Sequence, residues 1–415
     1  MDLIQYHDDL RKEDVPTMLA GAAAVLPVVS IAGFEIVLGA AILSMIVLRV
    51  KPRWPAVWLP VSLFILGTVI SWLASGDLRG GLPQIKKFYV YAMVFVVVSA
   101  FRNVAQIRWL ALGWAAAATA SAGLGLYQFY DKYEDAMEKH QTFYDAYVAD
   151  RITGFLDHWM TFSGEMMMAL LIIASTVFFC RDRRWVAWLV AAGALIGIAL
   201  VAAETRSMWA GAGCGGIYLL WFWRRWTVIA LPVLAGILML MNPFGIGERE
   251  RSMLHPHGDE DSNAHRDVVH RIGWAMIKAH PLLGVGPEQV GKVYKSYVPA
   301  DVKKLPTGYY QHLHNVYIHY AAERGVPTML MLVWMLLRAL YDFVRTLRRL
   351  PADAEERWVL HMGIAVIIAI MIAAWEEVNL GTSVVLAMFL AVVGCGYAVV
   401  FTCPEPQSSP SSDRR

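Results

Sequence analysis

Two arginines in this sequence stand where a guanidinium could bind an anion, and Arg206 is the first. It lies in AAETRSMWAGA, next to Glu204, at the junction of two long apolar segments. A helix that begins there favours an anion through its exposed N–H groups and its dipole, and a guanidinium binds phosphate in a bidentate way. Alternatively, the Arg206 side chain extends along apolar surface to water and pairs with Glu204.

The second arginine, Arg266, lies in HRDVVHRIGWAMIKAHPLLGVG, residues 265–286. Five residues recur there at helical spacing: Arg266, Val269, Gly273, Met276 and Ile277. The pattern predicts an amphipathic helix that ends at His280-Pro281. Five residues of a helix turn through about 140° beyond a full turn, so Arg271 is expected on another face than Arg266.

A histidine in HLHNVYIHYAAERGVPTML, residues 312–330, could act as a general base. An imidazole with its ordinary pKa of about 6.5 can accept a proton near neutral pH. His314 precedes Asn315, a residue type that caps helices, and Tyr317 follows; both are candidate helpers. Alternatively, His314 is a packed and hydrogen-bonded side chain without a role in catalysis.

Acidic residues offer two further candidate sites. Glu376 and Glu377 follow a long apolar segment, where they could serve as an acid or base or form a structural ion pair. HPHGDED, residues 255–261, superficially resembles a metal site. Its contiguous His and acidic residues favour a solvated, mobile loop, because metal ligands usually come from elements that hold their geometry. The sequence therefore predicts no metal and no other cofactor.

The composition indicates the elements that must position these residues. Of the 415 residues, 57% are hydrophobic and only 17% are charged, which excludes a water-soluble globular enzyme and a disordered chain. The formal net charge of +2 gives no support for nucleic-acid binding. We expect an all-α polytopic membrane protein with about twelve spans. The predicted spans are 16–32, 34–50 (separated by little more than Gly33), 54–75, 87–101, 109–130, 160–180, 185–203, 207–223, 227–242, 326–344, 358–375 and 382–402.

The distribution of basic residues predicts the orientation. With the N-terminus inside, cytoplasmic segments carry 19 of the 36 Lys and Arg, and the short outer loops carry seven. Two outer segments, 131–159 and 243–325, are too long to be simple connections. Ten of the twelve histidines lie between His140 and His319, so the polar chemistry is expected to face outward.

The predicted organisation follows from these segments. Residues 1–242 hold spans one to nine, 243–325 form a partly helical outer domain, 326–402 hold spans ten to twelve, and 403–415 form a disordered tail. The polar N-terminus predicts no cleavable signal peptide. Cys180, Cys214, Cys395 and Cys403 are expected to be small apolar side chains without a disulfide framework. The inner loops contain no glycine-rich phosphate loop, which argues against nucleotide use.

Several of these segments together resemble the O-antigen ligase and polymerase superfamily. ETRSMW resembles the family's element in which an arginine opens a helix. Arg266, fifteen residues before Pro281, stands where the family has its loop arginine. HLHNVYIHYAAERGVPT resembles the HNxYL…GxxG element, with Thr328 at the second glycine, and RITGFL, residues 151–156, resembles the R-x-x-G-x-F element. His270 stands where the family usually has a bulky aromatic residue.

The resemblance implies a glycosyltransferase of the all-helical, GT-C-like membrane class in a bacterial inner membrane. Such an enzyme moves a finished polysaccharide from undecaprenyl pyrophosphate to a sugar of the lipid A core on the periplasmic face. It implies pyrophosphate binding by Arg206, Arg266 and Arg151, and His314 as the base of an inverting displacement. The energy lies in the carrier's phosphoester bond, so no nucleotide is needed.

Two alternatives remain open. An O-antigen polymerase, or a ligase that glycosylates proteins, would use the same motifs. We prefer the core ligase because the outer domain is modest in size. From a different class, a polyprenyl-lipid transporter or flippase would also need outward arginines, but it should carry cationic residues deep within several spans or internal repeats.

Overall fold

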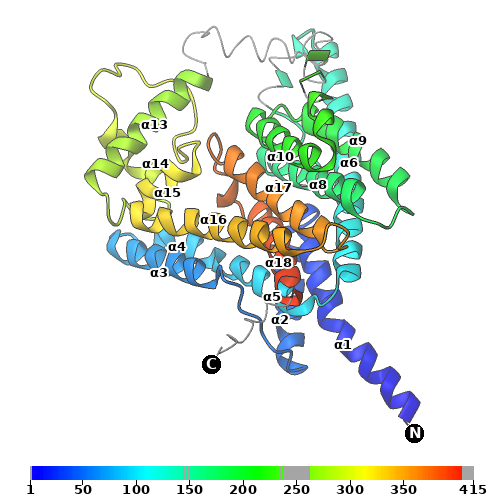
Figure 1. The fold of residues 1–415 in the computed structure, drawn as a ribbon. Helices are drawn as coiled ribbons and strands as arrows, with labels where there is room; N and C mark the ends of the chain where they lie inside the picture. The colour runs from blue at the N-terminus through cyan, green and yellow to red at the C-terminus, as the bar shows by residue number, and fades with distance from the viewer. Residues whose placement is uncertain are drawn as a thin grey trace, which may run out of the picture.

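The computed structural model describes residues 2–143, 146–147, 150–230, 232–233, 236–237 and 262–403. These described residues form helices and no strand, so the all-helical fold class is confirmed for them (Figure 1). Half of the ninth predicted span, 227–242, lies outside the described residues. In the other half, residues 227–229 belong to the short 3₁₀ helix η3 (Arg225–Ile229), and residues 230, 232–233 and 236–237 are helical.

The first two helices form a hairpin. α1 (Asp2–Val25) continues into the 3₁₀ helix η1 (Leu26–Val28), and α2 begins at Ile31 and ends at Val47. The break lies at residues 26–30 and not at Gly33, so the predicted boundary was wrong. Pro27 fixes its own φ angle and lacks an N–H, and the Ser30 hydroxyl then caps α2 by accepting a hydrogen bond from Gly33 N at 3.2 Å.

Apart from α4, which precedes a predicted apolar segment, the remaining helices of the bundle follow the predicted apolar segments with shifted ends. Their bounds are α3 (Trp58–Ala74), α4 (Leu78–Lys86), α5 (Ala92–Ala100), α6 (Val104–Glu138), α8 (Trp159–Phe179), α9 (Val186–Ala202), α10 (Arg206–Arg224), α16 (Val326–Arg349), α17 (Arg357–Ala373) and α18 (Ser383–Thr402). The 3₁₀ helix η2 (Lys87–Tyr91) joins α4 to α5. The predicted span 87–101 therefore begins too late, and 109–130 is too short at both ends.

Five segments of the described residues are long and apolar enough to cross a membrane. They are 78–100, 104–138, 159–179, 326–349 and 383–402. Five shorter apolar helices lie at 14–28, 31–47, 58–74, 186–202 and 357–373. The chain is thus a helical membrane protein, and the total of twelve spans stays a prediction.

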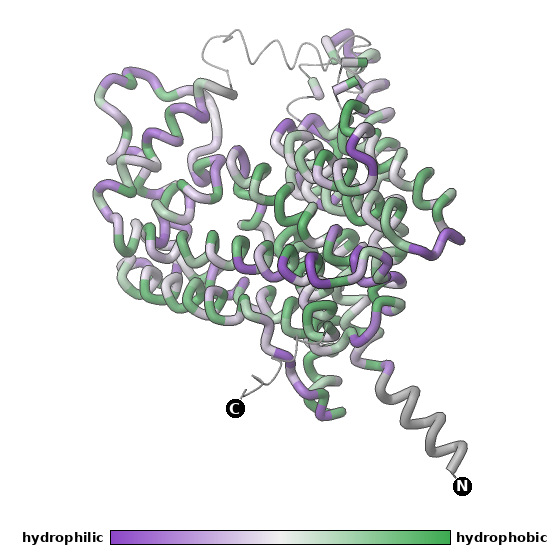
Figure 2. Tube along the Cα trace, viewed as in Figure 1, coloured by the Kyte–Doolittle hydropathy of each residue, from purple (hydrophilic) through white to green (hydrophobic). Residues whose placement is uncertain are grey.

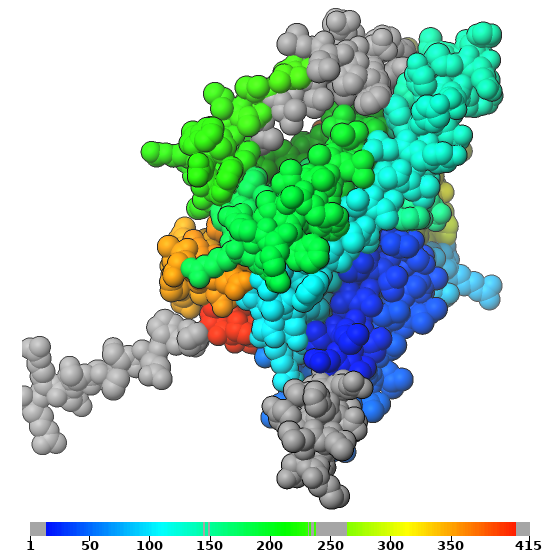
Figure 3. Space-filling view, turned by 90° about the vertical axis from the view of Figure 1, so that its right-hand side faces the viewer, coloured from blue at the N-terminus to red at the C-terminus, as the bar shows by residue number. Residues whose placement is uncertain are grey.

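α18 lies at the centre of the bundle. It packs against α5, α17, α16 and α8, and nearly all of its side chains are buried. Figure 3 shows the face on which α1, α6 and α9 lie beside one another. Large apolar side chains such as Ile36, at 73% exposure, point outward from the bundle, as expected where lipid replaces water.

Close packing between two helices of the bundle, α10 and α17, depends on a pair of small residues. Gly211 and Gly215 lie one turn apart on α10, and α10 packs against α17. A Cβ at Gly211 would lie 2.7 Å from the Ala369 carbonyl oxygen, and one at Gly215 would lie 2.9 Å from that of Ala365. The two glycines therefore let the backbones of α10 and α17 approach each other.

Residues 262–325 form a small helical unit, called here the loop domain, beside the membrane-type helices. It contains α13 (Ser262–Ala279), α14 (Val290–Val293), the 3₁₀ helix η6 (Tyr294–Tyr297) and α15 (Val316–Arg324). Figure 2 shows more hydrophilic chain here than along the bundle. Its own core includes Val269, Met276 and Leu313, which confirms the amphipathic helix predicted for 265–279. α13 ends before His280-Pro281, as expected.

Candidate active site

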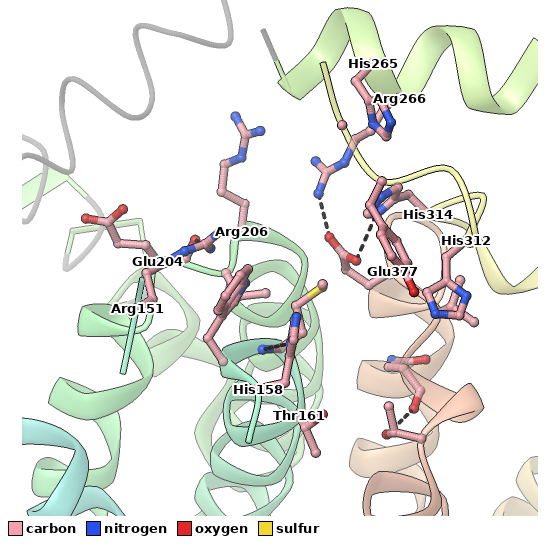
Figure 4. A pocket seen from close by; sticks show the side chains of 18 of the residues that line it. Arg151, His158, Thr161, Glu204, Arg206, His265, Arg266, His312, His314 and Glu377 are labelled. Carbon is pink, nitrogen blue, oxygen red and sulfur yellow. Dashed lines mark hydrogen bonds and ion pairs between the residues drawn. The ribbon is translucent and has the colours of Figure 1, made fainter. Parts of the chain in front are cut away.

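A cavity of about 930 Å³ lies where the loop domain faces the starts of α8 and α10. Its lining comes from four parts of the chain: residues 151–161, 204–206, the loop domain and residues 377–385. Figure 4 shows two walls facing each other. Arg151, His158, Glu204 and Arg206 lie on one wall, and His265, Arg266, His312, His314 and Glu377 lie on the other.

The first wall carries two arginines, Arg151 and Arg206. α10 begins at Arg206, and Thr205, the residue before it, makes no side-chain capping bond to the helix. Instead, the Thr205 hydroxyl accepts a hydrogen bond from the Ser163 hydroxyl at 3.0 Å, which ties this helix start to α8. The Arg206 side chain extends from that start into the space between the walls (Figure 4).

Arg151 is fixed by the segment that follows it. The Gln128 side chain on α6 accepts from Thr153 N and Gly154 N, each at 3.0 Å, and so holds the RITGFL segment against the bundle. The Arg151 guanidinium donates to the Glu204 carbonyl oxygen at 3.1 Å and lies 4.6 Å from the ring centre of Trp159. These contacts fix Arg151, and the first wall thus presents two guanidinium groups and one carboxylate, that of Glu204.

The second wall is built around Glu377. Its Oε1 accepts from Arg266 Nη2 at 2.5 Å, and its Oε2 lies 3.2 Å from His314 Nδ1. Glu377 is 4% exposed, so both contacts are shielded from water. Arg266 also has a longer contact, 3.6 Å, between Nη1 and Glu376, whose side chain is 42% exposed. One buried carboxylate thus joins the arginine of α13 to the candidate base.

The backbone at His314 is held in an unusual conformation. Its φ angle of 47° lies in the left-handed region, which costs a non-glycine residue of order 1 kcal/mol or more. The next residue, Asn315, is the N-cap of α15 and accepts from Ile318 N at 2.9 Å. Asn315 Nδ2 donates to the Trp375 carbonyl oxygen at 2.8 Å. These bonds hold His314 beside Glu377 despite the strain.

The ionisation states of the cavity follow from burial and neighbouring charge. Burial alone would raise the pKa of Glu377, but the hydrogen bond from His314 and the charge of Arg266 together lower it below its ordinary value. Burial, with the charges of His314 and Arg266, lowers the pKa of His265 to about 4. Burial is also the main cause that lowers the pKa of His158 and His312. Glu377 is therefore an anion at neutral pH, and these three imidazoles are neutral.

The cavity brings together most of the residues that the sequence singled out. Arg151, Arg206, Arg266, His314 and Glu377 all line it. Their roles in catalysis or binding stay predictions.

Three predicted helpers lie outside the lining. Asn315 is 2% exposed and serves as the helix cap, and Tyr317 donates to the Met371 carbonyl oxygen at 3.0 Å. Glu376 lies at the edge, in contact with Arg266. Arg271 points elsewhere, as predicted, and pairs with Asp301 at 2.6 Å.

The described residues hold no group of three or more His, Cys, Asp or Glu that could bind a metal ion. The segment HPHGDED, 255–261, lies outside the described residues, so the expectation of metal independence stays a prediction. All four cysteines carry free thiols, with Cys180 and Cys395 buried and Cys214 and Cys403 partly exposed.

Sequence reasoning missed several lining residues: His158, Glu204 as a wall residue, His265, Tyr309 and His312. His158 caps α8, since its Nδ1 accepts from Met160 N at 3.2 Å. The signal for it was present in the clustering of histidines between His140 and His319. That clustering did not distinguish the histidines of the cavity from His280, which instead contacts Tyr297 at 2.8 Å.

Comparison with known families fits this geometry. Residues 191–333 match the model of the O-antigen ligase family, which confirms the resemblance seen in the sequence. The matched range contains Arg206, Arg266 and His314, whereas Arg151 and Glu377 lie outside it. A comparison with curated proteins finds no match. The match covers about a third of the chain, so it shows that this part is similar to the O-antigen ligase family, whose members are glycosyltransferase-like enzymes.

Proposed function

We propose that this protein is an O-antigen ligase. It transfers a polysaccharide from undecaprenyl pyrophosphate to a sugar hydroxyl of the lipid A-core oligosaccharide, without a metal ion and with inversion. The reaction takes place on the periplasmic side of a bacterial inner membrane, with both termini in the cytoplasm. The observation that carries the proposal is the cavity itself, in which guanidinium groups on one wall face a histidine–carboxylate pair on the other.

The acceptor hydroxyl oxygen attacks the anomeric carbon of the donor, and the bond from that carbon to the phosphate oxygen breaks. The leaving pyrophosphate keeps the electron pair. His314 Nδ1 is engaged with Glu377 at 3.2 Å, so Nε2 is the atom that accepts the hydroxyl proton. The buried Glu377 carboxylate stabilises the imidazolium that forms, and it fixes the tautomer before the reaction.

The leaving group collects negative charge as the bond breaks, and cations must compensate for it. Arg206 at the start of α10 and Arg151 beside it supply guanidinium groups from the first wall. Arg206 also lies at the positive end of a 19-residue helix. Arg266 contributes from the second wall through the Nη1 edge of its guanidinium, which faces the exposed Glu376. Its Nη2 edge is bound to Glu377.

The test is transfer by the purified protein, with carrier-linked glycan as donor and rough lipopolysaccharide as acceptor. A ladder of capped lipopolysaccharide supports the ligase. Growth of polymer on the carrier without capping would instead identify a polymerase. Movement of the lipid-linked glycan across proteoliposomes without any covalent product would identify a transporter.

A further inference from the structure

One aromatic ring on the cavity wall is not used by the transfer step. Tyr309 lines the cavity and is 53% exposed. Its hydroxyl donates to Gln311 Oε1 at 2.6 Å, and its ring centre lies 5.4 Å from that of His312. A large, half-exposed aromatic ring on a cavity wall costs free energy unless a ligand covers it.

Trp159 is the other large aromatic residue in the lining, and its surroundings differ. The Arg151 guanidinium lies 4.6 Å from its ring centre, and the His158 ring stacks on it at 4.2 Å. Trp159 therefore already has partners for its ring. Tyr309, at 53% exposure, is the more open of the two rings to a ligand.

The backbone around Tyr309 is held in place by its neighbours. Tyr310 stacks on Tyr294 at 4.7 Å and donates through its hydroxyl to the Pro306 carbonyl oxygen at 2.7 Å. A Cβ at Gly308 would lie 2.3 Å from the His265 ring, so only glycine lets the chain approach so closely. One tyrosine anchors the loop while the adjacent one faces the cavity, which makes Tyr309 a preorganised platform.

We propose that Tyr309 forms a subsite for a pyranose ring of the acceptor glycan. A pyranose presents a row of C–H groups on one face, which packs against an aromatic ring, and its hydroxyl groups point outward to polar partners. Thr307 and His312 line the cavity beside Tyr309, and Gln311 is bonded to its hydroxyl, so such partners are at hand.

The position of Tyr309 indicates that its ring binds the acceptor sugar and not the donor sugar. This step rests on the proposed function. In an inverting displacement the attacking hydroxyl and the leaving phosphate lie on opposite sides of the anomeric carbon. Two of the three arginines proposed to bind the phosphate, Arg151 and Arg206, lie on the first wall, and His314 receives the proton at the second. Tyr309 lies on the side of the second wall, because its ring centre is 5.4 Å from that of His312 on that wall. Its ring therefore contacts the sugar that attacks.

The experiment measures binding of rough lipopolysaccharide to the full-length protein in nanodiscs, with lipid A that carries no core sugars as the second ligand. Binding alone is measured, so the result does not depend on transfer. We expect Tyr309→Ala to weaken binding of rough lipopolysaccharide about tenfold and to leave binding of lipid A unchanged. Tyr309→Phe and Tyr309→Trp keep a ring and should restore the affinity. Tyr297→Ala, in the same domain but outside the cavity lining, is the matched control.

Equal affinity of Tyr309→Ala and wild type for rough lipopolysaccharide would overturn the proposal. So would an equal loss for lipid A, because that result assigns the effect to the lipid portion. In the transfer assay, the same variant should raise the KM for the acceptor and leave the KM for the donor unchanged; the reverse pattern would place the donor sugar on Tyr309. A wild-type protein that binds rough lipopolysaccharide but transfers nothing contradicts the proposed function while leaving the subsite intact.

Discussion

Replacing Glu377 with glutamine tests the buried pair on which the proposed base depends. Glu377 is 4% exposed, accepts from Arg266 Nη2 at 2.5 Å and lies 3.2 Å from His314 Nδ1. Glutamine keeps the size of the side chain but removes the charge. The amide can still accept one hydrogen bond, but it cannot stabilise an imidazolium as an anion does.

The size of the effect follows from the bond that is lost. A hydrogen bond to a charged group contributes about 1.5–3 kcal/mol, and each 1.36 kcal/mol is a factor of ten in rate. Glu377→Gln should therefore reduce kcat by about 10- to 100-fold. His314→Ala removes the base itself and should cost about 10²–10⁴-fold. Because Glu377 acts through His314, the double variant should be no slower than His314→Ala alone.

The assay is the initial rate of capped lipopolysaccharide formation by purified protein at saturating donor. Glu376→Gln is the matched control, because Glu376 is the adjacent residue with the same chemistry but is 42% exposed and lies 3.6 Å from Arg266. It should change the rate less than about fivefold, since exposed ion pairs contribute only about 0–1 kcal/mol. Membrane levels and thermal unfolding of each variant show whether it folds. Additive losses in the double variant, or equal losses for Glu376→Gln and Glu377→Gln, would refute the reasoning.

Three further predictions follow from the site. Arg206→Lys keeps the charge but loses the planar guanidinium. It should reduce kcat by about 10²–10³-fold, the loss typical when one preorganised donor to a developing anion is removed. Normal activity at normal protein levels would argue against phosphate binding by Arg206. A base accepts a proton only in its neutral form, so the rate should not fall as the pH is raised from 5 to 9, in wild type and in His312→Ala. A rate that falls steadily over that range would leave His314 a cationic role only. Transfer in excess EDTA should equal the untreated control, and deletion of 255–261 should be tolerated; a loss restored by added magnesium or manganese would contradict metal independence.

The sequence predicted the fold best where apolar residues alone form a helix. α9, at Val186–Ala202, lies within two residues of its predicted bounds. The prediction failed where polar residues continue a helix. The segment LRGGLPQIK precedes the apolar run and still forms α4, and the charged end of α6 extends to Glu138. Hydropathy measures transfer to lipid and not helix formation, so it marks the apolar part of such helices only. The cap at Asn103 and Gln106 was a readable signal for the start of α6.

The candidate site could be predicted in its parts but not in its connections. Motif spacing indicated Arg206, Arg266 and His314, and it left Glu376 and Glu377 equivalent. His314 and Glu377 are 63 residues apart in the chain. They meet because α15 docks onto the end of α17, where Val316 N donates to the Ala374 carbonyl oxygen at 2.8 Å. No local pattern encodes that contact, which depends on tertiary packing.

The two edges of the Arg266 guanidinium are not equivalent, and this difference explains how one arginine can serve both the base and the leaving group. Its Nη2 edge holds the buried Glu377, and removing a partner from a buried ion pair costs about 3–5 kcal/mol. Its Nη1 edge faces the exposed Glu376 at 3.6 Å, a contact that contributes about 0–1 kcal/mol and can yield to a doubly charged phosphate. We infer that an arriving pyrophosphate displaces Glu376 and leaves Glu377 in place. Arg266 then bridges the leaving group and the carboxylate that orients His314, which a lysine with a single point charge cannot do.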